Sequence, residues 1–357
     1  MAEFDSIGVE FRVNHGQLDS FVEAVLEQVG VAPPHAATVA NGLVRADLRG
    51  VDSHGVARLP TYVRKFEAGG FDPDPSIQVE RTGPSAITVD ADDGPGQSAG
   101  VEAIDAAMEA AAETGMAGAT VLNSNHFGAA AYFTERASEH DFVGIATTNV
   151  DPGVVPFGGA SAFFGTNPIA ISIPTDRDFD VTLDMATSVV AFGKIDHVAK
   201  EEGTSIPAEW GVDAAGEPTT DPNEVAALRP LGGHKGYGLA LVVDVLSGLL
   251  SGAGPSTSVG ELYDDFAEPM RLGHFFAAID VGAFRYVDEF KAEMGAMIDD
   301  LKAQETRDGF DEIMLPGEIE SRTMAANLEA GVPIREGVRE DLEDLAVEYD
   351  VPFPDPV

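Results

Sequence analysis

The longest apolar stretch decides whether this chain is built for a membrane or for water. It reads YGLALVVDVLSGLLSGAG, from Tyr237 to Gly254, and Asp244 interrupts it. A membrane-spanning helix needs about 18 consecutive apolar residues, and an acidic side chain at its centre is costly. The stretch from Lys235 to Leu250 therefore predicts a buried helix of a soluble protein.

The charge of the chain excludes several partners. Its 61 acidic residues outnumber its 21 basic ones, which gives a formal net charge of -40, and the acids are dispersed along the sequence. Such a field repels nucleic acid and anionic membranes. A hydrophobic content of 44% argues against disorder. We interpret the acidic surplus as a hydrated shell suited to high salt, where repulsion is screened, and hence as a sign of halophilic origin.

Cysteine usage and the N-terminus indicate the compartment. The chain has no cysteine, which excludes disulfides, thiolate metal sites and a cysteine nucleophile. The first residues, MAEFDSIGVEFRV, contain neither a basic segment nor an apolar one of the kind that directs secretion. These features predict a cytoplasmic protein.

Helical and alternating apolar patterns both occur, which predicts an α/β protein. Two helices are expected within residues 17–51, and a turn-rich FDPDPSI segment follows them. We place a boundary near residue 72, with 1–72 as an N-terminal helical lobe and 73–322 as the central cofactor- and substrate-binding region. The segment 323–357 is expected to pack on the N-terminal lobe. Strands are expected near 86–90, 119–122, 142–150, 167–175, 180–188 and 275–281.

One glycine-rich segment imitates a dinucleotide-binding loop. Gly94, Gly96 and Ala99 match the pattern G-x-G-x-x-A between a strand and a helix. That fingerprint also needs an acidic residue at the end of the following strand, where this chain has Ser124 and Asn125. We interpret the segment as a glycine turn that opens an ordinary helix.

The segment VDSHGVARLP, residues 51–60, concentrates candidate catalytic side chains. It contains Ser53, His54 and Arg58. If the segment is helical, His54 and Arg58 project from one face; alternatively, Pro60 marks the start of the helix. His126 in NSNHFGAA and His234 in GGHKGYG also stand beside glycines or small residues, which allow close approach of a ligand.

These residues could serve a metal site, a serine hydrolase or hydride transfer. The histidines lack metal-site spacing, so no metal is expected, and no G-x-S-x-G motif supports a serine hydrolase. Hydride transfer from a 2-hydroxy acid needs a base for the hydroxyl proton and a cation for the carboxylate, which His54 and Arg58 could supply. Lys235 in GGHKGYG could contact cofactor phosphates. The residues alone favour an enzyme and leave its reaction open.

Seven segments in order carry a resemblance to a known family. They are RADLRGVDSHGVARLPTYV, NSNHFGAAAYF, FGTNPIAISIPT, LDMATSVVAFGKI, PTTDP, LGGHKGYGLALVVDVLSGLLSGA and MLPGEIE. Together they resemble the malate/L-lactate dehydrogenase family of NAD(P)-dependent oxidoreductases, from about residue 20 to residue 322. The resemblance implies a non-Rossmann fold of the sulfolactate-dehydrogenase type, a mostly antiparallel central sheet with helical outer lobes, and a homodimer.

The resemblance also implies roles for individual residues. His54 would exchange the proton, Ser53 would hydrogen-bond to it, and His126 would be a second active-site histidine that some members use as the base. Arg58 and Thr166 would contact the substrate. Contacts with NAD or NADP would come from His126 and from eight further residues: Asp184, Met185, Ala186, His234, Lys235, Pro316, Gly317 and Glu318.

Two departures bear on the subfamily. Lys194 stands where some imino-acid-reducing members carry an aspartate, which favours a hydroxy-acid substrate such as malate or lactate. The segment NVDPGVVPFGGA resembles ureidoglycolate dehydrogenases, but its Val150 replaces a small polar residue. Ureidoglycolate dehydrogenase is therefore the alternative, ahead of an imino-acid reductase or a non-catalytic binding protein of the same fold.

Overall fold

A computed structural model describes residues 11–199 and 203–357. Its centre is a seven-stranded sheet in the order β2-β3-β4-β10-β5-β6-β7. The strands are β2 (Gln78–Gly83), β3 (Ala86–Asp90), β4 (Met116–Ser124), β5 (Phe142–Thr148), β6 (Ile169–Ile173), β7 (Val181–Met185) and β10 (Leu272–Asp280). The six strands other than β2 overlap the segments expected from alternating apolar residues, because most of them pack apolar side chains into the core. β2, which that pattern does not predict, is almost entirely exposed.

The sheet is mixed, which corrects the expectation of a mostly antiparallel sheet in one place. β3 and β4 run parallel and are joined by α4 (Gly96–Thr114). A helical crossover returns the chain in the same direction, so these two strands align rather than oppose. The other neighbouring pairs are antiparallel.

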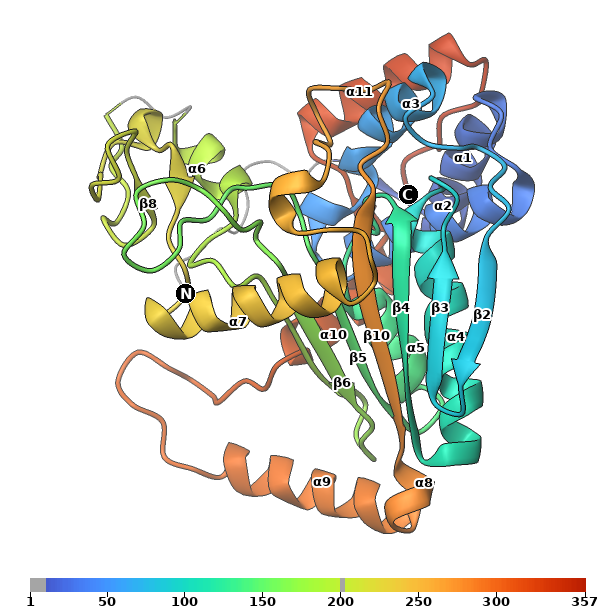
Figure 1. Cartoon of the computed structure of the whole chain (residues 1–357), viewed down its shortest axis with the longest axis vertical. Helices are drawn as coiled ribbons and strands as arrows, with labels where there is room; N and C mark the ends of the chain where they lie inside the picture. The colour runs from blue at the N-terminus through green and yellow to red at the C-terminus, as the bar shows by residue number, and fades with distance from the viewer. Residues whose placement is uncertain (1–10, 200–202) are drawn as a thin grey trace.

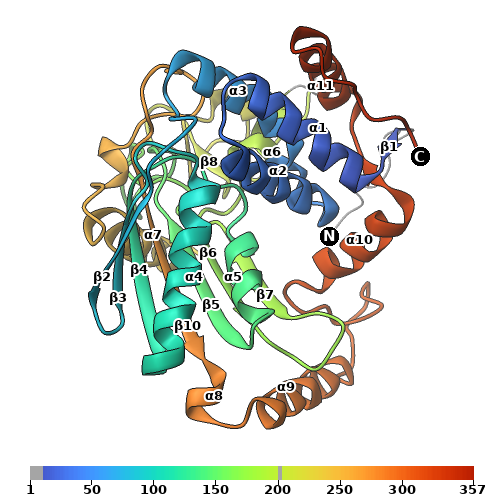
Figure 2. The ribbon, with the colours of Figure 1, turned by 90° about the vertical axis from the view of Figure 1, so that its right-hand side faces the viewer.

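Helices cover the two faces of this sheet differently. α4 and α5 (Ala131–Ser138) pack on one face, and α7 (His234–Asp244) crosses the other (Figures 1 and 2). Small side chains allow α4 and α5 to approach the strands closely. The buried alanines of this core are Ala91, Ala99, Ala103, Ala107, Ala110, Ala111, Ala117, Ala119, Ala130, Ala137, Ala146, Ala170 and Ala278.

The glycine turn before α4 serves packing. A Cβ on Gly94 would collide with Pro75, and one on Gly96 would collide with the backbone of Asn125. The Asn125 side chain in turn donates to the carbonyls of Asp93 (2.6 Å) and Gly94 (2.9 Å). The glycines that imitate a phosphate loop are thus explained by close backbone contact.

A second layer combines the two ends of the described chain. Its helices are α1 (His15–Gln28), α2 (Pro33–Leu48), α3 (Leu59–Ala68), α10 (Glu318–Ala330) and α11 (Glu336–Glu348). β1 (Arg12–Val13) pairs with β11 (Val332–Pro333), and Leu342 and Leu345 join the apolar core formed by α1 and α2. α3 starts with Pro60 in its first turn and ends at Gly69, whose φ of 86° is the left-handed conformation that favours glycine.

Further elements extend from the sheet. α6 (Phe192–Ala199), β8 (Gly211–Val212) and β9 (Ala227–Leu228) surround a small core that includes Val154 and Phe164. Figure 1 places α8 (Val281–Phe284) and α9 (Val287–Lys302) beyond the opposite end of the sheet, from which a loop leads back to α10.

The apolar helix is only half buried, which corrects the expectation drawn from the longest apolar stretch. α7 continues as a π-helical turn over Val245–Leu249, and its inner face packs Ala240 and Val243. Its outer face is exposed, because the sheet covers one side only. The exposed residues and their exposed fractions are Leu239 (40%), Leu241 (44%), Val242 (51%), Val245 (43%), Leu249 (56%) and Leu250 (59%). In the described part of the chain, no helix has the length and apolarity that crossing a membrane requires.

Candidate active site

The segment that carries His54 and Arg58 is two tight turns followed by a helix. Residues Asp52–His54 and Val56–Arg58 each form a 3₁₀ turn, and α3 begins at Leu59. The interpretation of residues 53–60 as one helix is wrong, because Gly55 is extended (ψ -155°) and interrupts it. Pro60 lies in the first turn of α3, the position that suits its missing N–H.

Buried Asp47, in α2, fixes these turns. Its Oδ2 accepts a hydrogen bond from the Val56 N–H at 2.7 Å, and a Cβ on Gly55 would collide with its carboxyl group. Burial raises the pKa of Asp47 well above its ordinary value, although the Val56 N–H opposes that rise. The turns therefore have one backbone path, which requires glycine at 55 and a short acceptor at 47.

His54 is a neutral histidine at this turn. Its Nδ1 lies 3.0 Å from Ser53 Oγ, and the Arg58 Nε donates to the Ser53 carbonyl at 2.6 Å. Enclosure by protein, and then the Arg58 charge, lower the pKa of His54 to about 4. The imidazole is thus unprotonated near pH 7 and can accept a proton.

His126 lies against His54 from the loop after β4. The two rings stack with centroids 5.7 Å apart and an interplanar angle of 21°. His126 Nδ1 lies 2.6 Å from Tyr62 OH and 3.3 Å from the Gly128 N, and Gln97 Nε2 donates to Tyr62 OH at 3.0 Å. Burial lowers the pKa of His126 well below its ordinary value, and the charge of Arg58 lowers it further.

Arg58 faces a loop that a buried lysine holds in place. Its guanidinium carbon is 5.5 Å from the centre of the Tyr263 ring. Lys65 has no exposed surface, and its Nζ donates to the carbonyls of Glu261 (2.8 Å), Asp265 (2.5 Å) and Glu268 (3.1 Å). Three carbonyl acceptors satisfy the ammonium group, so this lysine anchors the loop beside Arg58.

A cavity of 1280 Å³ opens beside His54. Its lining comes from the turn at 51–54, the start of α5, strand β7 and the segment before α10. The lining includes Arg49, Ser53, His54, Gly128, Ala129, Ala130, Ala131, Thr166, Asp184, Met185, Ala186, Arg307, Pro316 and Gly317. Most of the residues expected at the site therefore meet around one cavity, although they come from distant parts of the sequence.

Asp184 joins β7 to the start of α5. Its Oδ2 accepts from the Ala131 N–H at 2.8 Å. The side chain is open to the cavity but otherwise enclosed by protein, which raises its pKa, while Ala131 N–H and Arg49 oppose the rise. Asp184 thus fixes the strand against the helix at the place where a ligand would pass.

Glu318 holds the segment before α10 in place. Its Oε1 pairs with Lys302 Nζ (2.6 Å) and Arg322 (2.7 Å), and its Oε2 accepts from the Leu315 N–H (3.1 Å). Burial alone would raise the pKa of Glu318, but Lys302, the Leu315 N–H and Arg322 together lower it. Glu318 thus holds the segment that contains Pro316 and Gly317, both of which line the cavity. Glu318 itself is not among the described residues that line it.

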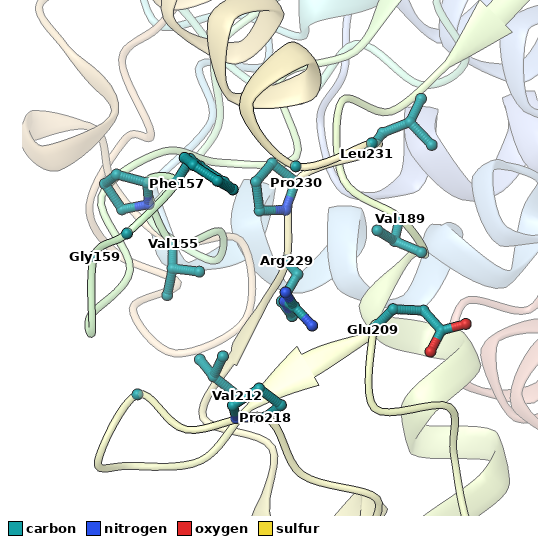
Figure 3. Close-up of a pocket in the computed structure, with 15 residues that line it drawn as sticks. Val155, Phe157, Gly159, Val189, Glu209, Val212, Pro218, Arg229, Pro230 and Leu231 are labelled. Carbon is teal, nitrogen blue, oxygen red and sulfur yellow. The ribbon is translucent and has the colours of Figure 1, made fainter.

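His234 and Lys235 are the first two residues of α7 and lie outside the lining of the large cavity. Neither is among the described residues that line the 1280 Å³ cavity. The His234 ring is 5.9 Å from that of Phe157, beside a cavity of 570 Å³. Figure 3 shows Arg229 and Glu209 among the mostly apolar side chains of this smaller cavity. The chain alone does not bring the α7 start to His54.

Sequence reasoning missed Asp47, Tyr62, Lys65 and Gln97. Three of these lie in or near the RADLRG and RLPTYV segments, but their partners are remote in sequence. Tyr62 meets Gln97 and His126 across 35 and 64 positions. The buried polar character of Gln97, 1% exposed at the start of α4, was the one available signal, and it required the fold to interpret.

The fold and this site define an α/β protein in which His54 lines a cavity of 1280 Å³ and stacks on His126. The family model for malate/L-lactate dehydrogenase matches residues 13–343. The chain belongs to the malate/L-lactate dehydrogenase family, as its motifs indicated.

Several dehydrogenases are similar to this chain in sequence and in fold. Malate dehydrogenase of Pyrococcus horikoshii is 41% identical over 94% of both chains. Ureidoglycolate dehydrogenase (NAD(+)) of Escherichia coli is 38% identical over 86% of this chain and 88% of its own. The solved structure of the Pyrococcus horikoshii enzyme aligns over 100% of both chains with a TM-score of 0.89 and 38% identity. The chain is thus similar in sequence and in fold to dehydrogenases of hydroxy acids.

Proposed function

We propose that this chain oxidises a small 2-hydroxy acid to the 2-oxo acid, and catalyses the reverse reduction, with a nicotinamide dinucleotide as hydride carrier. The observation that carries the proposal is the neutral His54 at the mouth of the 1280 Å³ cavity, with Arg58 on the next turn. A base and a guanidinium in this arrangement match a substrate that bears a hydroxyl beside a carboxylate.

The proposed reaction removes a proton and a hydride from the substrate carbinol. His54 accepts the hydroxyl proton, and Ser53 Oγ at Nδ1 orients the ring. Arg58 holds the carboxylate, so that the C2 carbon faces the cavity. When bound, the dinucleotide accepts the hydride from C2 as the carbonyl forms. In the reverse direction His54 returns the proton to the oxygen.

The residues of the cavity fit a dinucleotide. The cavity far exceeds the size of a hydroxy acid, and Gly128, Ala129 and Ala130 leave room for a flat ring beside His54. Gly317 adopts φ 85°, and a Cβ there would crowd Thr182. We propose that Asp184, Met185, Ala186, Pro316 and Gly317 contact the cofactor and that Thr166 contacts the substrate; roles for His234 and Lys235 remain predictions from the resemblance.

We propose a preference for NAD over NADP. The lining carries the acids Asp184, Glu305, Asp311, Glu312 and Glu320. Of the three arginines in the lining, Arg49 pairs with Glu135 and Arg322 pairs with Glu312 and Glu318, which leaves Arg307. A 2′-phosphate would thus meet more negative than free positive charge. Fluorescence titration of the reduced cofactors should give the lower dissociation constant for NADH, and tighter binding of NADPH would contradict the preference.

We propose that a second copy covers the exposed face of α7. Six leucines and valines on one helix are unusual on a chain of net charge -40, and a two-fold axis would place this apolar face against itself. Light scattering should show a dimer. Val242→Asp should yield a monomer, whereas Val347→Asp, a control at an 84% exposed position on α11, should not. A wild-type monomer would contradict the proposal.

Malate or lactate is the simplest substrate, and ureidoglycolate is the second candidate because a relative of that name shares 38% identity. The test measures nicotinamide absorbance at high salt with malate, lactate, ureidoglycolate and sulfolactate, each with NAD and NADP. Reduction with one acid supports the proposal and identifies the substrate. A folded protein that binds no cofactor and reduces none would contradict it.

A further inference from the structure

Gln97, Tyr62 and His126 form a chain of hydrogen-bond contacts beside His54. Tyr62 is 1% exposed and Gln97 is also 1% exposed, so neither exchanges its partners with bulk water. Gln97 Nε2 donates to the phenol oxygen at 3.0 Å. The phenol has one proton, and the remaining near neighbour of its oxygen is His126 Nδ1 at 2.6 Å. Tyr62 can therefore donate its one proton to His126 Nδ1.

A second donor points at the same nitrogen. The backbone N–H of Gly128 is directed at His126 Nδ1, with 3.3 Å between the nitrogens. A backbone amide can only donate, whereas the ends of a glutamine side chain could be exchanged. Two donors on Nδ1 leave no place for a proton there. In a neutral imidazole the proton must then sit on Nε2.

We propose that Tyr62 and Gln97 are positioning residues that hold His126 as the Nε2–H tautomer, so that His126 donates a hydrogen bond to the substrate oxygen while His54 exchanges the proton. The hydrogen bonds that described residues make to the His126 ring are at Nδ1, which leaves Nε2 for a ligand. His126 Nε2–H would stabilise the oxygen as charge develops on it.

The electrostatic surroundings agree with this division. The charged and titratable groups that act on His126 are His54, Arg58 and His274, and all of them disfavour a second proton on its ring. Burial raises the pKa of Tyr62 to about 12, so its phenol keeps the proton that it donates. His126 is consequently a neutral donor and has no free lone pair with which to act as the base. This inference rests on the proposed function, because it assigns roles within that site.

The first experiment reads the tautomer directly, without substrate. Long-range ¹H–¹⁵N spectra of the ligand-free, ¹⁵N-histidine-labelled protein should show His126 with a protonated Nε2 and an unprotonated Nδ1. The variant Tyr62→Phe should give a mixture of tautomers. Tyr132→Phe, on α5, removes another phenol, whose OH donates to Asn41 of α2 at 3.0 Å. This control should leave the His126 signals unchanged. A protonated Nδ1 in the wild-type protein would overturn the inference.

The second experiment separates donor from base. His126→Gln keeps an N–H near the Nε2 position and should lower kcat/KM about tenfold, with the acid limb of the pH profile in place. His54→Gln should lower it about 100-fold or more and remove that limb. Tyr62→Phe should lower kcat about fivefold. The inference fails if His126→Gln removes the limb.

The two experiments also distinguish this inference from the proposed function. An active enzyme with its proton on His126 Nδ1 overturns the inference and leaves the hydroxy-acid reaction standing. A protein with the Nε2–H tautomer that binds no cofactor and oxidises none of the four acids supports the tautomer and overturns the reaction.

Discussion

The two walls of the large cavity are held together by different forces. The N-terminal wall, residues 47–62, is fixed by hydrogen bonds between backbone and buried side chains, such as the one that the Val56 N–H donates to Asp47. The C-terminal wall, residues 302–322, is fixed by ion pairs that join Lys302, Glu312, Glu318 and Arg322. The Asp47 contact is buried, whereas Arg322 is 53% and Glu312 46% exposed, around a Glu318 that is only 4% exposed.

The N-terminal wall carries the proposed proton-transfer group, whereas the C-terminal wall carries proposed cofactor contacts. Hydrogen bonds to buried backbone are insensitive to salt, so the proton-transfer groups keep their geometry in any ionic strength. The outer pairs with Glu312 are partly exposed and screened by salt, so we expect the C-terminal wall to weaken as ionic strength rises. Asn327 of α10 links the walls, because its Nδ2 donates to the Leu48 carbonyl at 3.0 Å. We therefore expect salt to affect the C-terminal wall more than the N-terminal wall.

The largest effect is expected from the N-terminal wall. His54→Ala removes the proposed base, and turnover should fall about 100-fold or more. Because the C-terminal wall is untouched, the dissociation constant of the cofactor should stay nearly unchanged. Steady-state kinetics and cofactor fluorescence measure the two quantities. An equal loss in both would show that the walls are not independent.

Arg58 should give the next largest effect. Arg58→Ala removes a charge-assisted contact worth ~1.5–3 kcal/mol, so kcat/KM for carboxylate substrates should fall about 10- to 100-fold. Arg58→Lys keeps the charge without the planar fork and should lose less. Cofactor binding is the control. If it weakens as much as kcat/KM, Arg58 does not act on the substrate carboxylate.

The sequence predicts the parts of the fold and of the site that depend on local pattern. Alternation of apolar residues locates β3 and β5, and the motif around Ser53, His54 and Arg58 identifies the reacting turn. The path of that turn was not predictable, because Gly55 is extended only where buried Asp47 receives the Val56 N–H. Likewise, α7 has the composition of a buried helix, and composition alone cannot say whether the sheet or a second chain covers it.

The contacts that tune the histidines also lie beyond sequence reasoning. Tyr62 reads as an apolar position of α3, and Gln97 as part of a glycine-rich turn. Only the fold brings them to His126, because Tyr62 lies in α3, Gln97 lies in α4 and His126 follows β4. Motifs therefore identify the reacting groups, whereas the fold determines their protonation.

The pH dependence of the rate tests the N-terminal wall. Because His54 has a pKa of about 4, it remains an unprotonated base well below the ordinary histidine value of about 6.5. The acid limb of kcat/KM should lie near pH 4, with about a tenfold fall for each further pH unit. Because the folded pKa lies below the unfolded one, His54 also makes stability rise with pH between about 4 and about 6.5. A limb near pH 6.5 would contradict the enclosure of His54.

The smallest effect should come from the C-terminal wall, and it should depend on salt. Glu318→Gln weakens the pairs with Lys302 and Arg322 while keeping an acceptor for the Leu315 N–H. At low salt we expect a loss of ~1 kcal/mol in the free energy of unfolding and about fivefold weaker cofactor binding. At 1 M KCl the Debye length is about 3 Å, so both differences should shrink.

A matched control isolates the position of the charge. Glu343→Gln removes an equal charge from the exposed pair with Arg339 on α11, far from the cavity, and should leave cofactor binding unchanged. The wild-type protein should gain stability over the same titration, because salt screens its net charge of -40. Full stability in dilute buffer would contradict the halophilic interpretation. A Glu318→Gln effect that persists at 1 M KCl would show that the C-terminal wall is held like the N-terminal one, by buried contacts rather than by screened charge.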